Sequence, residues 1–194
     1  MLLIAATICA FGCNSGSDKD SVGKADSANA KNDTTGMTPQ SKIDTMQAPV
    51  NDDLAKFAVK VADVGMSEVA MGELAKEKAA NKKVREFGEM MIKDHTKAND
   101  ELKALAADKN ITLPAAPGTD MQKHIDDLAK KTGNDFDKDY INAMVSGHKD
   151  VISDFESEIK NTKDSAFKKF ASKTLPVLYK HLGSAEAIQK SNHY

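Results

Sequence analysis

The feature that most constrains the fold of this chain is the spacing of its apolar residues, which changes to steps of three and four from Asn51 onward. Such a repeat places one apolar stripe along an α-helix, whereas a strand buried on one face requires strict alternation. The pattern therefore predicts an all-α domain over residues 51–194.

Start and stop signals divide this region into four long helices and one short helix. Acidic and capping residues at 51–53 precede the first helix, and Asn81 marks the turn that follows it. Pro114 and Pro117 prevent the second helix from continuing into the next connection. The expected long helices span residues 54–80, 82–109, 135–161 and 165–190, and a short helix spans residues 121–131. We expect Pro176 to kink the last helix without ending it, because the apolar stripe resumes two residues later.

Short connections after the first and third long helices predict two antiparallel hairpins and hence an up-down four-helix bundle. The composition agrees, because Trp is absent and aromatic residues make up only 5% of the chain, which disfavours a β-sandwich or barrel. The 27 basic and 29 acidic residues are interleaved, so no positive field is available for nucleic acid. No nucleophile motif, catalytic carboxylate pair or phosphate-binding loop stands out, and no catalytic or cofactor-binding residue is predicted.

The first thirteen residues predict where the protein is located. Residues 1–12, MLLIAATICAFG, are uncharged and too short to span a bilayer, but they fit the apolar region of a signal peptide. Small residues before Cys13 resemble the lipobox of bacterial lipoproteins, in which the cysteine is lipidated and becomes the first residue. We therefore predict a membrane anchor at Cys13 in the bacterial envelope, on an outer membrane facing the periplasm or the exterior. The alternative is an apolar N-terminus with a chance cysteine.

Residues 14–50 are rich in Ser, Asp, Asn, Thr, Lys and Gly and contain almost no large apolar side chain. Such a segment buries too little surface to offset its ordering entropy. We expect a disordered tether with a root-mean-square reach of about 30–35 Å.

Each long helix carries one ionisable residue in its apolar stripe. The stripes are Leu54, Ala58, Val61, Gly65, Glu68, Gly72 and Ala75; Val84, Gly88, Met91, His95, Ala98, Leu102 and Leu105; Phe136, Tyr140, Met144, His148, Val151, Phe155 and Ile159; and Phe167, Ala171, Thr174, Leu178, His181, Ala185 and Ile188. Glu68 and His95 lie at similar distances from the turn that joins their helices, and so do His148 and His181. At a rise of about 1.5 Å per residue, all four side chains should meet near the middle of the bundle.

Two interpretations of this layer remain open. Glu68, His95, His148 and His181 form a donor set suited to one Zn, Mn, Fe or Cu ion, with Tyr140 bordering the site. In the metal-free alternative, Glu68 neutralises one imidazolium, and the hydroxyl groups of Tyr140 and of a threonine in the fourth stripe satisfy the other rings.

Several other residues are interpreted without a ligand role. His124 and His193 lie outside the long-helix stripes and are expected at the surface. Asp94 is interpreted as a carboxylate on a helix surface. Gly65 and Gly72 are expected to allow close packing of helices.

A resemblance to a known family rests on three segments, together with the helix that contains Glu68. They are MMIKDHTKANDELKALA (90–106), FDKDYINAMVSGHKDVISDFE (136–156) and TLPVLYKHLGSAEAI (174–188). They resemble the bacterial DUF4142 family, which is grouped with ferritin-like bundles, and the resemblance covers residues 53–189. It implies an exported four-helix domain, often on lipoproteins or outer-membrane proteins, with no established activity. The characteristic polar positions of that family correspond to Glu68, His95, Tyr140, His148 and His181.

The ferritin-like comparison bears on the kind of metal site. Di-iron members carry Glu-x-x-His on two helices, whereas this chain has Ile92, Val145 and Leu178 three residues before its stripe histidines. The resemblance therefore does not extend to a di-iron site, and a mononuclear site or a relic polar layer stays open. The expected function is that of an envelope lipoprotein with a non-catalytic binding or stress-related role, and the alternative is a metal-binding or metal-dependent redox protein.

Overall fold

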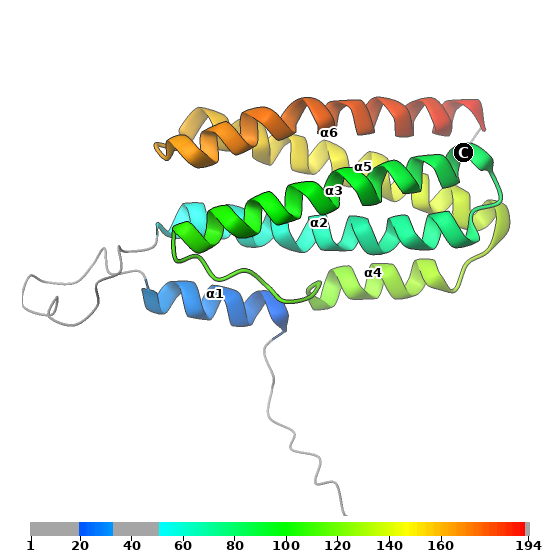
Figure 1. Cartoon of the computed structure of the whole chain (residues 1–194). Helices are drawn as coiled ribbons and strands as arrows, with labels where there is room; N and C mark the ends of the chain where they lie inside the picture. Colours follow the sequence, from blue (N-terminus) through cyan, green and yellow to red (C-terminus); the bar gives the residue numbers. More distant parts are fainter. Residues whose placement is uncertain (1–19, 33–50, 193–194) are drawn as a thin grey trace, which may run out of the picture.

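The computed structural model describes residues 20–32 and 51–192, and these residues form six α-helices (Figure 1). The helices are α1 (Ser21–Asn32), α2 (Asp52–Lys78), α3 (Lys82–Asp108), α4 (Thr119–Ala129), α5 (Gly133–Asn161) and α6 (Ser165–Ser191). None of the helices in this part of the chain is both long enough and apolar enough to cross a membrane. The predicted signal peptide and Cys13 lie outside the described residues.

The all-α prediction is confirmed, and helices α2 to α6 begin and end within two residues of their expected bounds. Asn51, Asn81 and Asp164 cap α2, α3 and α6, because each side chain accepts backbone N–H groups of the first turn at 2.8–3.0 Å. Pro176 lies inside α6, which continues to Ser191.

One end of the bundle, here called the Asn81 end, is held together by side chains that join three helices. The buried Asp137 of α5 accepts the backbone N–H groups of Ala80 and Asn81 at 3.0 and 2.8 Å. The Asn81 side chain donates a hydrogen bond of 2.8 Å to Asn192, which follows α6. The Asn81 end of the bundle therefore contains the last residues of α2 and α6 and the first residues of α3 and α5.

At the opposite end, here called the Asp164 end, Lys109 follows α3 and pairs with Asp164, the cap of α6, at 2.5 Å. Since α3 ends at the Asp164 end and α5 begins at the Asn81 end, residues 109–132 must run along the whole bundle. Helix α4 is part of this crossover (Figure 1). The four long helices thus run up, down, down and up, with the single long crossover found in ferritin-like bundles.

The predicted stripes form the core of this bundle. The only stripe residues that are not fully buried are Ala98, Leu105, Ile159 and Thr174. One apolar cluster, which includes Phe57, Phe155 and Phe167, fills the core toward the Asp164 end. A second cluster, which includes Phe87 and Phe136, fills the core toward the Asn81 end. The polar members of the stripes lie where the two clusters meet.

Glycines bring α2 and α3 close together, as expected from the sequence. A Cβ atom on Gly88 would lie 2.9 Å from the carbonyl oxygen of Gly72, and a Cβ atom on Gly65 would lie 2.2 Å from Oδ1 of Asn99. A side chain at position 88 would therefore force the two helices apart, whereas one at position 65 would displace the Asn99 side chain.

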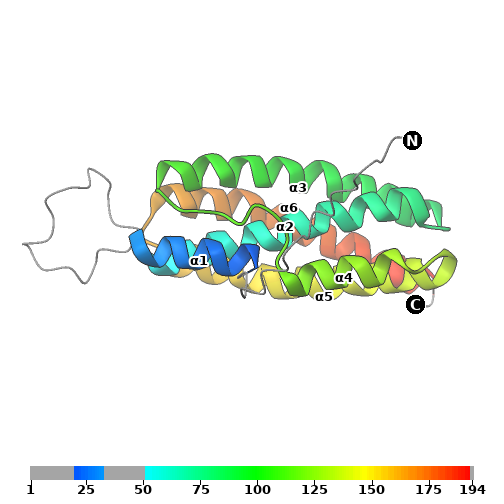
Figure 2. The same cartoon turned by 90° about the horizontal axis from the view of Figure 1, so that it is seen from below.

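Helix α1 differs from the expected disordered tether. It packs on α2 and on the crossover (Figure 2), where the buried Asn29 donates to the Thr112 carbonyl at 2.9 Å and accepts the Thr112 N–H at 2.7 Å. Ser21 Oγ accepts the backbone N–H groups of Ala115 and Ala116 at 2.9 and 3.1 Å. Polar side chains hold α1 in place, so a search for apolar periodicity could not detect it. Residues 14–19 and 33–50 of the expected tether lie outside the described residues.

Candidate metal centre

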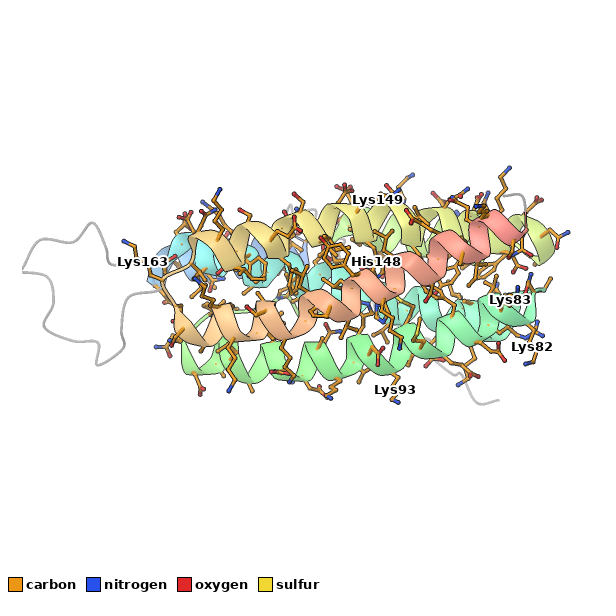
Figure 3. All side chains as sticks on the ribbon, turned by 90° about the horizontal axis from the view of Figure 1, so that it is seen from above. Lys82, Lys83, Lys93, His148, Lys149 and Lys163 are labelled. Carbon is orange, nitrogen blue, oxygen red and sulfur yellow. The ribbon has the colours of Figure 1, made fainter. Side chains whose placement is uncertain are left out.

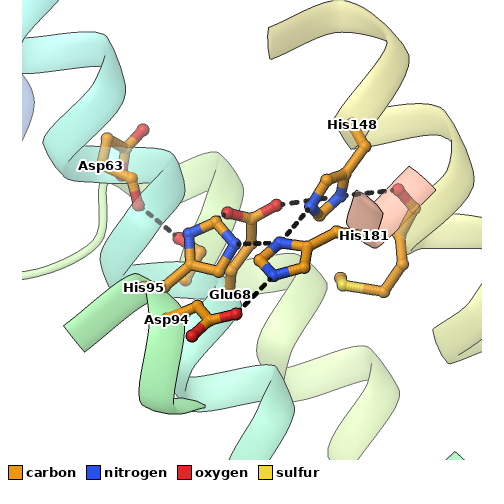
Figure 4. Close-up of polar contacts among 8 residues, drawn as sticks. Asp63, Glu68, Asp94, His95, His148 and His181 are labelled. Carbon is orange, nitrogen blue, oxygen red and sulfur yellow. Dashed lines mark hydrogen bonds and ion pairs between the residues drawn. The ribbon is translucent and has the colours of Figure 1, made fainter. Parts of the chain in front are cut away.

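The four long helices each contribute one side chain to a layer between the two apolar clusters. Glu68 comes from α2, His95 from α3, His148 from α5 and His181 from α6, and all four side chains are buried. His148 lies between the helices in Figure 3, whereas the labelled lysines project from the bundle surface. The four side chains therefore meet in one layer, as their stripe positions and heights along the helices predicted (Figure 4).

Glu68 joins two of the histidines through their Nδ1 atoms. Its Oε2 atom lies 3.0 Å from Nδ1 of His95, and its Oε1 atom lies 3.3 Å from Nδ1 of His148. The same His148 nitrogen lies 2.9 Å from the backbone carbonyl oxygen of Met144, one turn earlier in α5. Both rings thus present Nδ1 to hydrogen-bond acceptors.

His181 lies between the other two rings (Figure 4). Its Nδ1 atom is 3.3 Å from Nε2 of His95 and 3.3 Å from Nε2 of His148. Its Nε2 atom is 3.0 Å from Oδ2 of Asp94. The interpretation of Asp94 as a surface carboxylate without a role was wrong, because it lies at the edge of the α3 stripe, where it faces α6 and only a quarter of its side chain is exposed.

These contacts determine which ring nitrogens carry hydrogen. A carboxylate or carbonyl oxygen can only accept a hydrogen bond, so Nδ1 of His95, Nδ1 of His148 and Nε2 of His181 must be donors. A neutral imidazole has a single N–H, which leaves a lone pair on the other nitrogen. Three lone pairs, on Nε2 of His95, Nε2 of His148 and Nδ1 of His181, therefore converge when all three rings are neutral.

The two nitrogen separations at His181 match those of ligands in a tetrahedral metal site. Two nitrogens that bind Zn²⁺ at about 2.0–2.1 Å with a tetrahedral angle lie about 3.3–3.4 Å apart, and both measured separations from His181 Nδ1 are 3.3 Å. One ligand-capable nitrogen from each of the three rings lies within 4.8 Å of the others. The three rings could therefore share one ion.

Glu68 lies in the expected layer, where the sequence predicts it as one of four metal ligands. Its two oxygens face the Nδ1 atoms of His95 and His148, on the edges of these rings that carry N–H groups. In this arrangement Glu68 and Asp94 hold the histidine rings in place through their N–H groups. Carboxylates that hydrogen-bond to metal-binding histidines fix the tautomer and raise the basicity of the ring. The orientation of an imidazole ring cannot be read from residue spacing.

Burial and charge together set the protonation of the layer. Burial opposes the ionisation of Glu68, but the attraction of His95 and His148 outweighs it, and the pKa of Glu68 is lowered. Burial likewise opposes protonation of His95, yet the attraction of Glu68 outweighs it and raises the pKa of His95. Without a metal, Glu68 and His95 therefore form a buried ion pair.

The pKa values of the other two histidines are lowered. Burial lowers the pKa of His148, although Glu68 attracts its charged form. Burial lowers the pKa of His181 to about 4, helped by the neighbouring His95 and His148 and opposed by the hydrogen bond to Asp94. At neutral pH both rings are uncharged and keep their lone pairs.

The hydroxyl partners of the metal-free interpretation do not contribute to this network. Tyr140 is buried, stacks on Phe136 with ring centroids 5.9 Å apart, and its hydroxyl has no hydrogen-bond partner in the described part of the chain. Within the described residues, the histidine rings make their polar contacts with Glu68, Asp94, the Met144 carbonyl and one another. His124 is exposed, as expected, and His193 lies outside the described residues.

Three hollows adjoin the layer. A groove of about 420 Å³ between α2, α4 and α5 includes Glu68 and Met144 in its wall. A surface depression of about 120 Å³ between α3 and α6 includes Asp94, His95 and His181 in its wall. A cavity of about 20 Å³ is walled by Val61, Val64, Gly65, Glu68, His95, Ala98, Asn99, Val151, Phe155, Phe170, Thr174 and Leu178.

Comparison with known proteins gives one match. The sequence model of a family described as "Domain of unknown function (DUF4142)" matches residues 39–188, a range that includes Glu68, Asp94 and the three histidines. No curated protein and no solved structure matches the chain.

Proposed function

The chain belongs to the DUF4142 family, a domain of unknown function, so its role must be inferred from its own site, and we propose that it binds one divalent transition-metal ion. The ligands are Nε2 of His95, Nε2 of His148 and Nδ1 of His181. The observation that carries the proposal is the convergence of these three nitrogens, each on a ring whose other nitrogen is already held by an acceptor. Most metal-binding histidines have such an outer partner.

The charge of the layer favours a dication. Three neutral imidazoles add no charge, while Glu68 and Asp94 supply two negative charges within hydrogen-bond distance of the rings. A divalent ion is neutralised by these two carboxylates, whereas a monovalent or trivalent ion leaves a net charge in a buried site, which is costly.

The donor atoms narrow the choice of metal. An all-imidazole site suits Zn²⁺, Cu²⁺, Fe²⁺ and Ni²⁺, whereas Mn²⁺ prefers oxygen ligands. Because Glu68 directs its oxygens toward the Nδ1 atoms, Mn²⁺ is expected to bind more weakly than Zn²⁺. The metal-free network with a Glu68–His95 ion pair is the competing interpretation.

Equilibrium dialysis of the full-length chain against Zn²⁺, followed by elemental analysis, tests the proposal. We expect one Zn²⁺ per chain in the wild type, a large loss in the His148→Gln variant, and no change when the exposed His124 is replaced by Gln. Because Cys9 and Cys13 are present in all three proteins, binding by their thiols cannot imitate this pattern. Equal retention by His148→Gln and the wild type would contradict the proposal.

We further propose that lipidation of Cys13 anchors the domain to a membrane of the bacterial envelope. The support is the sequence alone, namely the apolar run of residues 1–12 and the small residues before the cysteine. In a bacterial host, Cys13→Ser should move the protein from the membrane fraction to the soluble fraction, and the wild type should carry a lipid mass. Recovery of both proteins in the same fraction would contradict the anchor.

A further inference from the structure

A tetrahedral ion bound by three histidine nitrogens would keep a fourth coordination position, which must be accounted for. We propose that the centre takes one small inorganic ligand from solvent at this position, and that the ligand enters between α3 and α6. The inference rests on the proposed metal site and adds to it an open coordination position and a route of entry.

The described residues supply no fourth side chain of the usual ligand types. The cluster of His, Cys, Asp and Glu side chains that can share one ion consists of His95, His148 and His181 alone. Both oxygens of Glu68 face Nδ1 atoms, and Asp94 contacts the far nitrogen of His181. A ligand for the fourth position must therefore come from outside the cluster. Zinc sites with three protein ligands and one exchangeable water have this composition.

Space for such a ligand lies directly beside the layer. The 20 Å³ cavity is walled by all four long helices, and Glu68 and His95 belong to its wall. Its other wall residues lie toward the Asp164 end from the layer, for example Val151 after His148 and Leu178 before His181. A cavity of only about 10–15 Å³ is enough to hold one water molecule. Asn99 and Thr174 add polar groups to its wall.

A route from solvent leads to this cavity through the side of the bundle formed by α3 and α6. The 120 Å³ depression on that side has two of the three ligands, His95 and His181, in its wall. It shares His95, Ala98, Thr174 and Leu178 with the cavity, so these four side chains lie between the two hollows. Ala98 and Thr174 are partly exposed, whereas His95 and Leu178 are buried.

The opposite groove is a weaker candidate for entry. It is larger, at about 420 Å³, but none of the three histidines belongs to its wall, and it reaches the layer only at Glu68. A ligand there would meet the carboxylate before the metal. The α3–α6 side gives direct access to the ligating rings.

The dimensions of the cavity determine the chemical class of the ligand. Pockets for organic ligands occupy about 300–1,000 Å³, whereas this cavity offers about 20 Å³. Water, hydroxide or an inorganic species of two or three atoms is therefore expected. The site is closed to organic substrates unless the helices separate.

Azide binding to the cobalt-loaded protein tests the inference. The full-length chain is loaded with one equivalent of Co²⁺, whose visible spectrum reports its ligands, and is titrated with sodium azide. We expect a saturable change with one azide per cobalt. Ala98→Leu, which fills the wall shared by the two hollows, should weaken azide binding at least about tenfold, or 1.4 kcal/mol, while Co²⁺ still binds. Ala143→Leu adds the same side chain to the opposite groove and should leave azide binding unchanged.

Each result leads to a definite conclusion. A cobalt spectrum that does not respond to azide in the wild type would overturn the open position while leaving the metal site intact. Weaker azide binding in Ala143→Leu but not in Ala98→Leu would overturn the entry route. If Co²⁺ itself fails to bind, the proposed function fails and this inference fails with it. Circular dichroism verifies that each variant is folded, and Ala98→Val provides a smaller filling side chain if leucine perturbs the bundle.

Discussion

Replacing His181 with Gln should reduce the loss of stability that the metal-free protein undergoes in acid. His181 has a pKa of about 4 in the folded protein, below the ordinary value of 6.5, because its ring is buried. Between these values the unfolded chain binds a proton at this residue and the folded protein does not. The contribution of His181 is therefore complete above pH 6.5 and is lost as the pH falls toward 4.

The size of the effect follows from the same interval. At 1.36 kcal/mol per pH unit, the interval from 6.5 to about 4 corresponds to about 3 kcal/mol of unfolding free energy. His148, whose pKa is also lowered, adds to the acid loss in both wild type and variant. The pKa of His95 is raised in the folded protein, so its contribution to stability is complete below pH 6.5 and is lost as the pH rises through its folded pKa. It therefore does not add to the loss of stability between pH 6.5 and pH 4.

Urea unfolding followed by far-UV circular dichroism, in EDTA and at half-unit steps from pH 7 to pH 4, measures this difference. The wild type should lose about 3 kcal/mol more than His181→Gln over the interval. The His124→Gln variant, which removes an exposed imidazole, should follow the wild-type curve. Parallel curves for His181→Gln and the wild type would show that His181 is not held neutral by burial, and would refute the reasoning about its lone pair.

Three further predictions concern other parts of the molecule. Glu68→Gln should weaken Zn²⁺ binding by about 10–100-fold in calorimetry, because the partner of two ligating rings loses its charge; unchanged affinity would contradict its orienting role. Gly88→Ala should lower the free energy of unfolding in urea by about 1–3 kcal/mol, because the new Cβ would lie 2.9 Å from the Gly72 carbonyl oxygen. Gly183→Ala, whose new Cβ would have no atom within 4 Å, should raise it by up to about 1 kcal/mol. The same sign for both glycines would exclude the close contact as the cause. Pro176→Ala should raise the melting temperature measured by calorimetry, because it restores a backbone donor inside α6, and a decrease would show that the proline is needed there.

Apolar periodicity was sufficient to predict the long helices because each of them buries a nearly continuous apolar stripe in the core. The residues of α2 from Leu54 to Ala75 illustrate this, since every stripe position is buried where the spacing placed it. The same criterion could not find α1, which is held by Asn29 and Ser21 through hydrogen bonds to the backbone of the crossover. Polar docking of this kind leaves no period in the sequence.

The candidate site was predictable to the level of residues but not of atoms. Stripe position and height along the helix brought Glu68 and the three histidines into one layer. Which ring atoms Glu68 faces depends on how the rings are rotated. The Met144 carbonyl holds Nδ1 of His148 on the side of Glu68, and Asp94 holds Nε2 of His181. The sequence contains no pattern that reports a ring angle, and Asp94 lies one residue off the stripe.

The docking of α1 has a consequence for how the protein would sit on a membrane. The start of α1 lies beside the middle of the bundle, where Ser21 holds the crossover and Gly118 contacts Asp63 of α2 at 2.7 Å. Cys13 precedes Asp20 by seven residues, which span at most about 25 Å when extended. A lipid on Cys13 would thus hold the start of α1, beside the middle of the bundle, within about 25 Å of the bilayer. Helices α1 and α4 cover the side formed by α2 and α5, so the α3–α6 depression would open away from the lipid (Figure 1).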